Sequence, residues 1–306
     1  MRAVLFPGQG SQYVGMGLNF YKKFDSVKKT FSLVDETLGF SLSNLILNGP
    51  ETELKLTQNT QPAIMTIGVS IFNVLKENYN FNLNKCKFLA GHSLGEYTAL
   101  VCSESITIET AAYLLNERGK AMQETISPGE GLMIAVLGMT LEEVEEEINL
   151  LPKNGTCEIA NDNTNGQVVV SGTKKTIEIF HSNLKNKKKR GIILPVSAPF
   201  HCSLMKEAAE KMKSKIEKAN FSNPKLPIIS NVTASEESDF NIIKSLLIKQ
   251  ITSRVRWRES VDYMVKNGVD DFIEIGPGKV LSGLVKKMDK DVKISNINSL
   301  DNLKND

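Results

Sequence analysis

The sequence predicts an α/β protein with a large domain built on a mostly parallel sheet and a small domain inserted into it. Short apolar runs alternate with longer segments of helical periodicity along most of the chain, which is typical of a parallel sheet covered by helices on both faces. Between residues 127 and 197 the order changes to strand–helix–strand–strand–helix–strand, the ferredoxin-like pattern. We therefore expect a large domain at residues 1–126 and 198–306 and a ferredoxin-like small domain at residues 127–197.

Composition excludes several classes of protein. The chain has 306 residues, 41% hydrophobic and 24% charged, which is ordinary for a soluble globular protein. A net charge of +2 without an aromatic-interleaved basic stripe argues against nucleic-acid binding. The N-terminus reaches Pro7 too early for a signal peptide, and no apolar run approaches the roughly 18 residues of a membrane helix. The four cysteines lack CxxC or metal-ligand spacing, so we expect reduced thiols in the cytoplasm and no metal.

The large domain is expected to begin with a buried strand at residues 3–6, followed by a tight loop at residues 7–12. This loop has two interpretations: it cradles a phosphate, or it presents backbone N–H groups or the Gln9 side chain to a site. The phosphate interpretation is disfavoured because the Gly-Lys-Ser/Thr of a P-loop is missing. Helical patterns follow, and a long helix is expected to open at residues 60–63, with Pro62 near its first turn, where a missing N–H costs little.

The central motif is Gly91-His92-Ser93-Leu94-Gly95, between an apolar strand at residues 87–90 and a helix at residues 96–101. Strand, Gly-x-Ser-x-Gly and helix together form the context of a nucleophile elbow, in which a sharp turn exposes the serine above a helix N-terminus. Such a turn needs flanking residues without a Cβ. The alternative is a glycine-rich turn with a bystander serine, which the flanking elements disfavour. We therefore predict an α/β-hydrolase-like large domain with Ser93 as its nucleophile.

Arg118 lies on the apolar stripe of a helix predicted at residues 108–124, at i+4 from Leu114 and i+7 from Ala111. An arginine on a core-facing stripe is rarely left unpaired. It either meets a buried carboxylate or binds an anionic ligand. The alternative is a side chain that extends to water at the helix edge. Periodicity alone leaves both interpretations open.

The small domain combines four predicted strands with two helices. Thr140 and Glu143 form a capping box, and Thr173 caps the second helix. The stretch 185–190 has five basic residues in six positions; it is either a solvated helix end or a contact for an acidic partner. The strands are expected at 132–137, 157–160, 167–171 and 192–196, and the helices at 141–150 and 174–187.

The second part of the large domain contains the candidate base. Serine is a weak nucleophile without a base in hydrogen-bond reach. Of the three histidines, His92 is expected to point away from its neighbour on the elbow, and His181 lies on an amphipathic helix of the small domain. His201 follows the insertion and is C-terminal to the serine, as in α/β-hydrolases, so elimination selects it. No acidic residue stands out as a third member, but a carbonyl can hold the imidazole tautomer instead.

The last elements continue the alternation of strands and helices. Helices are expected at 203–219, 241–250 and 257–267, strands at 226–231 and 272–275, and a closing helix after Gly276-Pro277-Gly278-Lys279.

Taken together, these stretches resemble the acyltransferases of fatty-acid and polyketide synthesis, and among them the malonyl-CoA:acyl carrier protein transacylases. The resemblance spans nearly the whole chain in the order of that family. The matching stretches are very specific jointly, whereas none of them is specific alone. They include the loop at residues 6–12 and the elbow at residues 91–97. The other matching positions are 60–63, Arg118, 165–169, 195–201, Gln250 and 274–281.

The resemblance implies roles for individual residues. Ser93 would be the acylated nucleophile and His201 its base. Gln9 and Leu94 would supply the backbone N–H groups of an oxyanion hole. Gln250 would orient His201 through its carbonyl.

The resemblance also implies a substrate and a reaction. Arg118 would pair bidentately with the free carboxylate of malonate, and Phe200 resembles the malonyl-selective pattern. Malonate would pass from coenzyme A to Ser93 and then to the phosphopantetheine thiol of acyl carrier protein, by a ping-pong mechanism that supplies fatty-acid synthesis. The expected partners are acyl carrier protein and coenzyme A thioesters; no cofactor is required, and a monomer is expected.

Three other functions compete with this one. A serine esterase or thioesterase fits Ser93 and His201 equally well, but has no need of Arg118 or of the inserted domain. A carrier-protein-binding module without activity would lack a competent pair of nucleophile and base. A free-standing acyltransferase of a polyketide synthase would keep the chemistry and change only the pathway.

Overall fold

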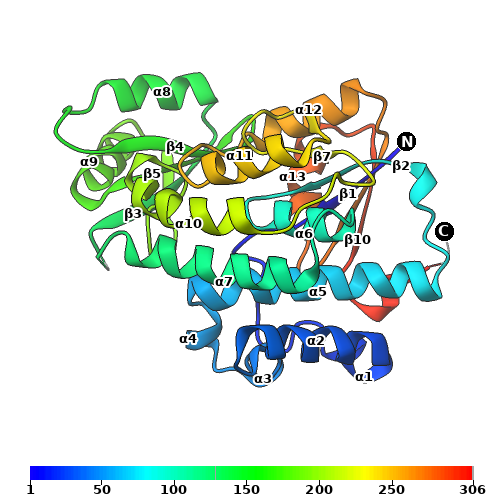
Figure 1. The fold of residues 1–306 in the computed structure, drawn as a ribbon. Coiled ribbons are helices and arrows are strands. Elements are labelled where there is room, and N and C mark those ends of the chain that lie inside the picture. Colours follow the sequence, from blue (N-terminus) through cyan, green and yellow to red (C-terminus); the bar gives the residue numbers. More distant parts are fainter. Residues whose placement is uncertain (128, 305–306) are drawn as a thin grey trace.

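The computed structural model describes residues 1–127 and 129–304 and contains two sheets (Figure 1). The larger sheet has the strand order β10-β9-β1-β2-β7-β8. All of its neighbouring strands are parallel except β7 and β8, which confirms the predicted mostly parallel sheet. Its strands are β1 (Arg2–Phe6), β2 (Cys86–Gly91), β7 (Ile228–Ile229), β8 (Glu236–Glu237), β9 (Asp271–Ile275) and β10 (Lys293–Ile297).

Both faces of this sheet are buried, which explains why its central strand β1 is continuously apolar from Ala3 to Phe6. Successive side chains of β1 alternate between two cores. Val4 and Phe6 belong to a large core with the helices on one side, whereas Ala3 and Leu5 pack in a second core with Trp257. Figure 1 shows α5 beneath the large sheet, α7 alongside α5 and beneath α10, and α1–α3 as a further layer below them.

Eleven helices belong to this part of the described chain. They are α1 (Leu18–Lys23), α2 (Asp25–Leu38), α3 (Leu42–Asn48), α4 (Glu51–Leu54), α5 (Thr57–Asn78), α6 (Gly95–Cys102), α7 (Ile108–Glu124), α10 (Lys206–Lys218), α11 (Phe240–Gln250), α12 (Trp257–Lys266) and α13 (Val280–Met288). No helix among the residues described is long and apolar enough to cross a membrane.

The predicted position of Pro62 at the start of a helix is wrong. Helix α5 begins at Thr57, so Pro62 lies inside it. A proline there leaves the carbonyl four residues earlier without its helical donor. That carbonyl belongs to Gln58, and the Asn116 side chain of α7 donates to it at 2.9 Å. A side chain from the neighbouring helix therefore compensates for the missing N–H.

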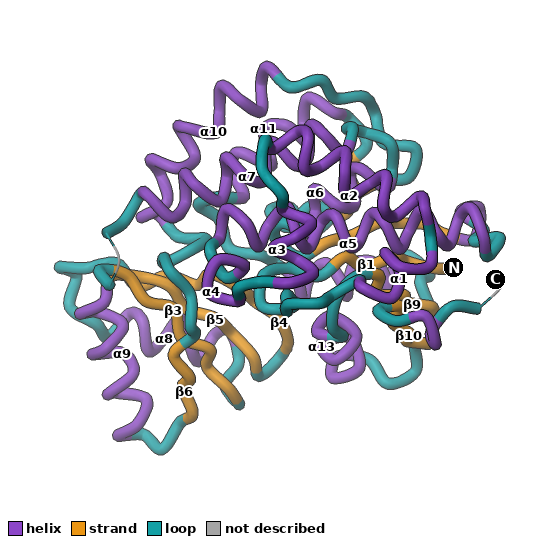
Figure 2. The backbone as a smooth tube through the Cα atoms, turned by 90° about the horizontal axis from the view of Figure 1, so that it is seen from below, coloured by secondary structure: helices purple, strands orange, loops and turns teal. Residues whose placement is uncertain are grey.

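The smaller sheet is antiparallel and has the order β4-β5-β3-β6 (Figure 2). Together with its two helices it confirms the ferredoxin-like pattern, and the capping box between Thr140 and Glu143 is present. Its elements are β3 (Gly131–Leu137), α8 (Leu141–Asn149), β4 (Cys157–Thr164), β5 (Gln167–Thr173), α9 (Lys174–Asn186) and β6 (Arg190–Ile193).

The boundaries of the inserted domain at residues 127 and 197 stay a prediction. Strand β4 hydrogen-bonds the large part directly, since the N–H of Asp162 donates to the carbonyl of Val255 and the N–H of Val255 to the carbonyl of Ala160, at 2.9 and 2.8 Å. Met133 of β3 also packs in the core of the large part. The two parts thus share backbone pairing and core packing.

Several strand predictions are corrected. Strand β6 ends at Ile193 instead of residue 196, because Pro195 has no N–H for a ladder. Strand β7 is two residues long rather than six. Strands β8 and β10 are additional, and both lie at sheet edges, where short or polar strands give little apolar signal.

Candidate active site

The turn between β2 and α6 has the geometry of a nucleophile elbow. Ser93 adopts a positive φ of 54°. A Cβ on Gly91 would lie 1.9 Å from the carbonyl carbon of Gly95, and one on Gly95 would lie 2.2 Å from the carbonyl oxygen of Phe6. Neither position can accept a side chain without moving backbone. The two glycines are therefore required by the close approach of β1, β2 and α6.

Ser93 and His201 are brought together although 108 residues separate them. The Ser93 Oγ lies 2.8 Å from His201 Nε2, and His201 Nδ1 lies 2.9 Å from the backbone carbonyl of Gln250. Because a carbonyl only accepts, Nδ1 carries the proton and Nε2 is free to accept one from the serine. Burial, and secondly the charge of Arg118, lowers the pKa of His201 to about 3. The imidazole is thus neutral at neutral pH, as a general base must be.

Arg118 is buried next to the serine, with 1% of its surface exposed, so it does not extend to water. One nitrogen, Nη1, donates to Gln61 Oε1 at 2.7 Å. The other, Nη2, donates to Gln250 Oε1 at 2.9 Å and to Ser93 Oγ at 3.1 Å. Among the residues described, no carboxylate forms an ion pair with it. A buried guanidinium whose partners are all neutral favours an anionic ligand, because a buried charge is costly unless it is paired.

These side chains surround one cavity of about 370 Å³. Ser93, Arg118 and His201 line it, together with Gln9 and Leu94. Within residues 1–127 and 129–304, the backbone N–H groups of Gln9 and Leu94 donate to no other group, so both remain available. The rest of the wall has an apolar part, formed by Met122, Met133, Leu194, Val196 and Phe200, and a polar part that includes Gln12, Lys55, Gln61, His92 and Asn161.

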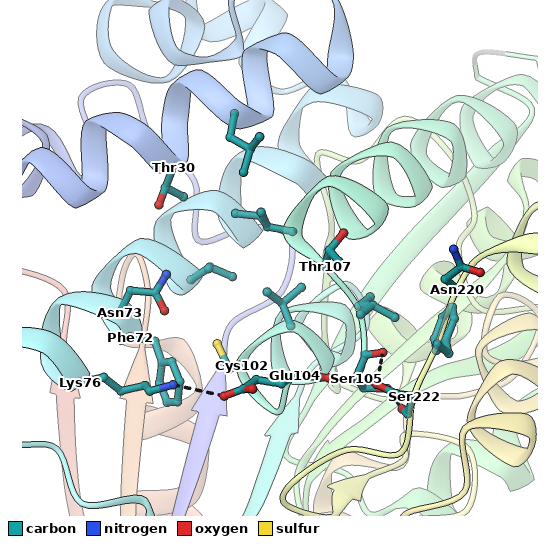
Figure 3. Close-up of a pocket in the computed structure, with 16 residues that line it drawn as sticks. Thr30, Phe72, Asn73, Lys76, Cys102, Glu104, Ser105, Thr107, Asn220 and Ser222 are labelled. Carbon is teal, nitrogen blue, oxygen red and sulfur yellow. Dashed lines mark hydrogen bonds and ion pairs between the residues drawn. The ribbon is translucent and has the colours of Figure 1, made fainter.

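A larger cavity, about 670 Å³, lies elsewhere between α2, α5, the start of α7 and residues 220–222 (Figure 3). Its polar groups are largely paired within the protein. Lys76 Nζ lies 3.5 Å from Glu104, and the Ser105 hydroxyl donates to the carbonyl of Ser222 at 2.6 Å. None of the predicted site residues lines this cavity. We therefore assign the site to the smaller one.

The structure also places the other two histidines. His92 lines the same cavity but forms no hydrogen bond with Ser93 in the part of the chain described; its Nε2 is 3.0 Å from the side-chain oxygen of Asn163 in β4. Its ring faces Trp257 at 5.6 Å between centroids. His181 is half-buried on α9. No group of three or more His, Cys, Asp or Glu in the part described could hold a metal ion.

Sequence reasoning missed three polar residues behind the serine, namely Asn231, Glu96 and Gln61. Asn231 Oδ1 accepts the N–H of Ser93 at 2.7 Å, and Gln250 Nε2 lies 2.8 Å from Glu96. Gln61 holds Arg118. Asn231 carried a usable signal, since it ends a predicted strand, and ligands gather at the carboxyl ends of parallel strands. The other two lie inside helices and had no such signal.

Comparisons with known proteins agree with this geometry. Residues 4–306 match the model of the family described as "Acyl transferase domain". The chain is 44% identical over 293 residues to "Malonyl CoA-acyl carrier protein transacylase" of Bacillus subtilis (strain 168), covering 95% of this chain and 91% of that protein.

Solved structures of other proteins are also similar to this chain in sequence and in fold. The acyl-carrier-protein-S-malonyltransferase from Bartonella henselae superposes with a TM-score of 0.96 at 42% identity, covering 99% of this chain and 96% of that one. A malonyl-transacylase solved in complex with its type II polyketide synthase acyl-carrier protein gives a TM-score of 0.94 at 36% identity, covering 99% and 97%. The chain therefore belongs to the acyl transferase family.

Proposed function

We propose that this protein transfers a malonyl group from malonyl-CoA to the phosphopantetheine thiol of an acyl carrier protein, through an ester on Ser93. The observation that carries the proposal is the buried Arg118, whose Nη2 lies 3.1 Å from the Ser93 Oγ that also contacts His201. A general esterase has no use for a buried cation beside its nucleophile, whereas malonate has a free carboxylate. The names of the relatives support the same substrate and acceptor.

In the first half-reaction, His201 Nε2 takes the proton of Ser93 Oγ as the oxygen attacks the thioester carbonyl carbon. The carbonyl oxygen becomes an oxyanion in the tetrahedral intermediate, which the N–H groups of Gln9 and Leu94 would stabilise. The carbon–sulfur bond then breaks, and coenzyme A leaves as a thiol with the proton from His201. The malonyl group remains on Ser93 as an ester.

The second half-reaction runs the same steps with another thiol. His201 takes the proton of the phosphopantetheine thiol, and its sulfur attacks the ester carbon. The bond to Ser93 Oγ breaks, and the serine regains its proton from His201. The proton of Ser93 leaves on coenzyme A, and the proton of the phosphopantetheine thiol replaces it on the serine. Each half-reaction therefore balances with side chains and backbone alone, and we propose that no metal or redox cofactor takes part.

Arg118 would receive the malonyl carboxylate. A guanidinium offers planar N–H groups that match a carboxylate through two hydrogen bonds. Its present partners are the amide oxygens of Gln61 and Gln250 and the Ser93 hydroxyl, which hold the group in place without neutralising it. The apolar part of the cavity wall excludes water and strengthens that pairing.

The acceptor is proposed to be an acyl carrier protein of fatty-acid synthesis, with a polyketide assembly line as the alternative pathway. The neighbour solved with its type II polyketide synthase carrier protein supports a carrier protein as the partner of this fold. We further propose a monomer acting in the cytoplasm.

Intact mass spectrometry tests the proposal. Brief mixing with malonyl-CoA in the absence of carrier protein should add one malonyl group, and Ser93→Ala should remove the adduct. Adding carrier protein should then discharge the ester onto the carrier. An equal adduct on the Ser93→Ala variant, or release of free malonate instead of transfer, would contradict the proposed function.

A further inference from the structure

Glu96 is a buried carboxylate that the steps above do not use. It lies in the first turn of α6, three residues after Ser93, and only 2% of its surface is exposed. Its Oε2 accepts the backbone N–H of Asn231 at 3.1 Å and the Gln250 Nε2 at 2.8 Å. In the part of the chain described it forms no ion pair. A buried charge held only by neutral donors is costly. The presence of the Glu96 carboxylate beneath the elbow therefore indicates that it has a function there.

Gln250 connects this carboxylate to the reacting groups. Its Nε2 faces Glu96, and the same nitrogen also contacts the Ser93 carbonyl at 3.2 Å. Its Oε1 accepts from Arg118 Nη2 at 2.9 Å. Its backbone carbonyl accepts from His201 Nδ1. One residue thus contacts the nucleophile, the base and the guanidinium.

The orientation of the Gln250 amide depends on what faces it. An amide can present either its oxygen or its NH₂ group to a neighbour, whereas an ionised carboxylate only accepts. An ionised Glu96 at 2.8 Å therefore requires the NH₂ group on its side, as the neutral Ser93 carbonyl at 3.2 Å does more weakly. The oxygen is then left facing Arg118, which only donates.

We propose that Glu96 is a positioning residue: it fixes the Gln250 amide with its oxygen toward Arg118, and so directs the guanidinium toward the carboxylate of a malonyl group on Ser93. The inference rests on the proposed function, because it assigns Glu96 to the recognition of malonyl rather than to acyl transfer in general. It requires Glu96 in its ionised state.

The surroundings of Glu96 make that state dependent on pH near neutrality. Burial raises the pKa of Glu96 to about 7, against the lowering effects of the Asn231 and Gln250 hydrogen bonds and of Arg118 on α7, while Glu237 of β8 raises it further. The neighbouring Tyr97 stays neutral, because burial raises its pKa to about 12. A protonated Glu96 gains an O–H donor and no longer requires the NH₂ group of Gln250. Only the longer contacts to the Ser93 carbonyl and Asn231 Oδ1, at 3.2 and 3.4 Å, then hold the amide, so it is fixed less firmly. Alignment of Arg118 should therefore be present above pH 7 and lost as the pH falls through that value.

The ratio of kcat/KM for malonyl-CoA to that for acetyl-CoA is the measurement. Groups that act equally on both thioesters, such as His201, cancel in it. In the wild type the ratio should fall about tenfold or more between pH 8.5 and 5.5. In Glu96→Gln it should be low throughout and independent of pH, since the amide neither titrates nor forces one orientation.

Glu274 offers a matched control. It is 1% exposed, and its carboxylate accepts the backbone N–H groups of Leu281 and Ser282 at 3.0 and 2.7 Å, outside the cavity. Glu274→Gln also removes a buried charge, so it should lower stability while leaving the malonyl-to-acetyl ratio and its pH profile unchanged. The same change in both variants would mean that Glu96 is merely structural.

The outcomes separate this inference from the proposed function. If the wild type forms no malonyl ester, the function fails. If the wild type loads malonyl and the ratio stays flat with pH, or if Glu96→Gln keeps the wild-type ratio and profile, the role of Glu96 is overturned. The wild-type profile decides the question alone if Glu96→Gln does not fold, which its unfolding temperature would reveal.

Discussion

The site residues differ in how their positions follow from the sequence. Ser93 has a local signal, because glycines at both ends of a strand–turn–helix permit one kind of turn. His201 was selected by elimination among three histidines. Glu96 and Gln250 had no such local signal, and Gln250 was assigned only through the family resemblance. Their contact has none either, since 154 residues separate them and each lies in a helix. Their contact depends on how α6 packs near α11, which periodicity does not encode.

Arg118→Ala should shift the enzyme from malonyl toward acetyl. A hydrogen bond to a charged group contributes about 1.5–3 kcal/mol, so losing the proposed carboxylate pair should lower malonyl use about tenfold to a hundredfold, at about 1.4 kcal/mol per decade. Acetyl never makes that contact and should suffer less. The measurement is kcat/KM for both thioesters on wild type and variant, with the mass of acylated Ser93 as a check on the nucleophile. An equal loss of kcat/KM for both thioesters would show that Arg118 has only a structural role.

At the scale of elements, buried strands were easier to predict than edge strands. Strands β1 and β2 lie inside the sheet and contain short apolar runs, and β9 beside them has three apolar residues in five. Strand β10 lies at the edge, where Lys293, Ser295 and Asn296 leave only two apolar residues in five. Its pairing with β9 arises from backbone hydrogen bonds that any sequence can make. Edge strands are therefore determined by the neighbouring strand more than by their own pattern.

The packing of α5 against α7 predicts that Asn116 contributes to the stability of the fold. Because Pro62 leaves the Gln58 carbonyl without a helical donor, Asn116→Ala should leave that carbonyl unsatisfied in a partly buried place. The free energy of unfolding should fall by about 1–3 kcal/mol, as measured by urea denaturation.

Asn73 supplies the control for this measurement. It lies on α5, is half-buried, and its side chain makes no hydrogen bond with the residues described. Asn73→Ala should therefore change stability by less than about 0.5 kcal/mol. Equal effects at the two asparagines would show that the Gln58 carbonyl is satisfied by other means.

At the scale of the whole molecule, the cavity lies where the two sheets meet. Arg118 and Met122 come from α7, whereas Met133 and Asn161 come from β3 and β4. The buried Asp162 strengthens the junction, because Arg258 Nη2 of α12 lies 2.8 Å from its carboxylate. The sequence predicted both parts but not this junction, since its contacts join segments whose separate patterns carry no information about one another.

The basic stretch 185–190 of the smaller part predicts where a carrier protein docks. In the basic stretch 185–190, Lys187 pairs with Glu147 of α8 at 2.6 Å and Lys189 approaches Glu143 at 3.7 Å, so part of its charge is neutralised. Arg190 forms no ion pair in the described chain and is exposed at the start of β6. The same segment reaches the cavity wall at Leu194. An unpaired cation on the strand that leads to the cavity wall should attract the acidic carrier proteins of this pathway.

Arg190→Ala should therefore slow the second half-reaction at low salt, by about threefold to tenfold, and leave loading from malonyl-CoA nearly unchanged. Exposed charges act mainly on the rate of encounter and are screened by salt, so the difference should shrink as ionic strength rises. Rapid mixing of malonyl-loaded enzyme with carrier protein, quenching at set times and mass spectrometry give the rate of malonyl transfer. Lys290→Ala removes the same charge between α13 and β10, outside the cavity lining, and should have no effect. If both variants transfer equally well at every salt concentration, the carrier protein does not dock beside β6.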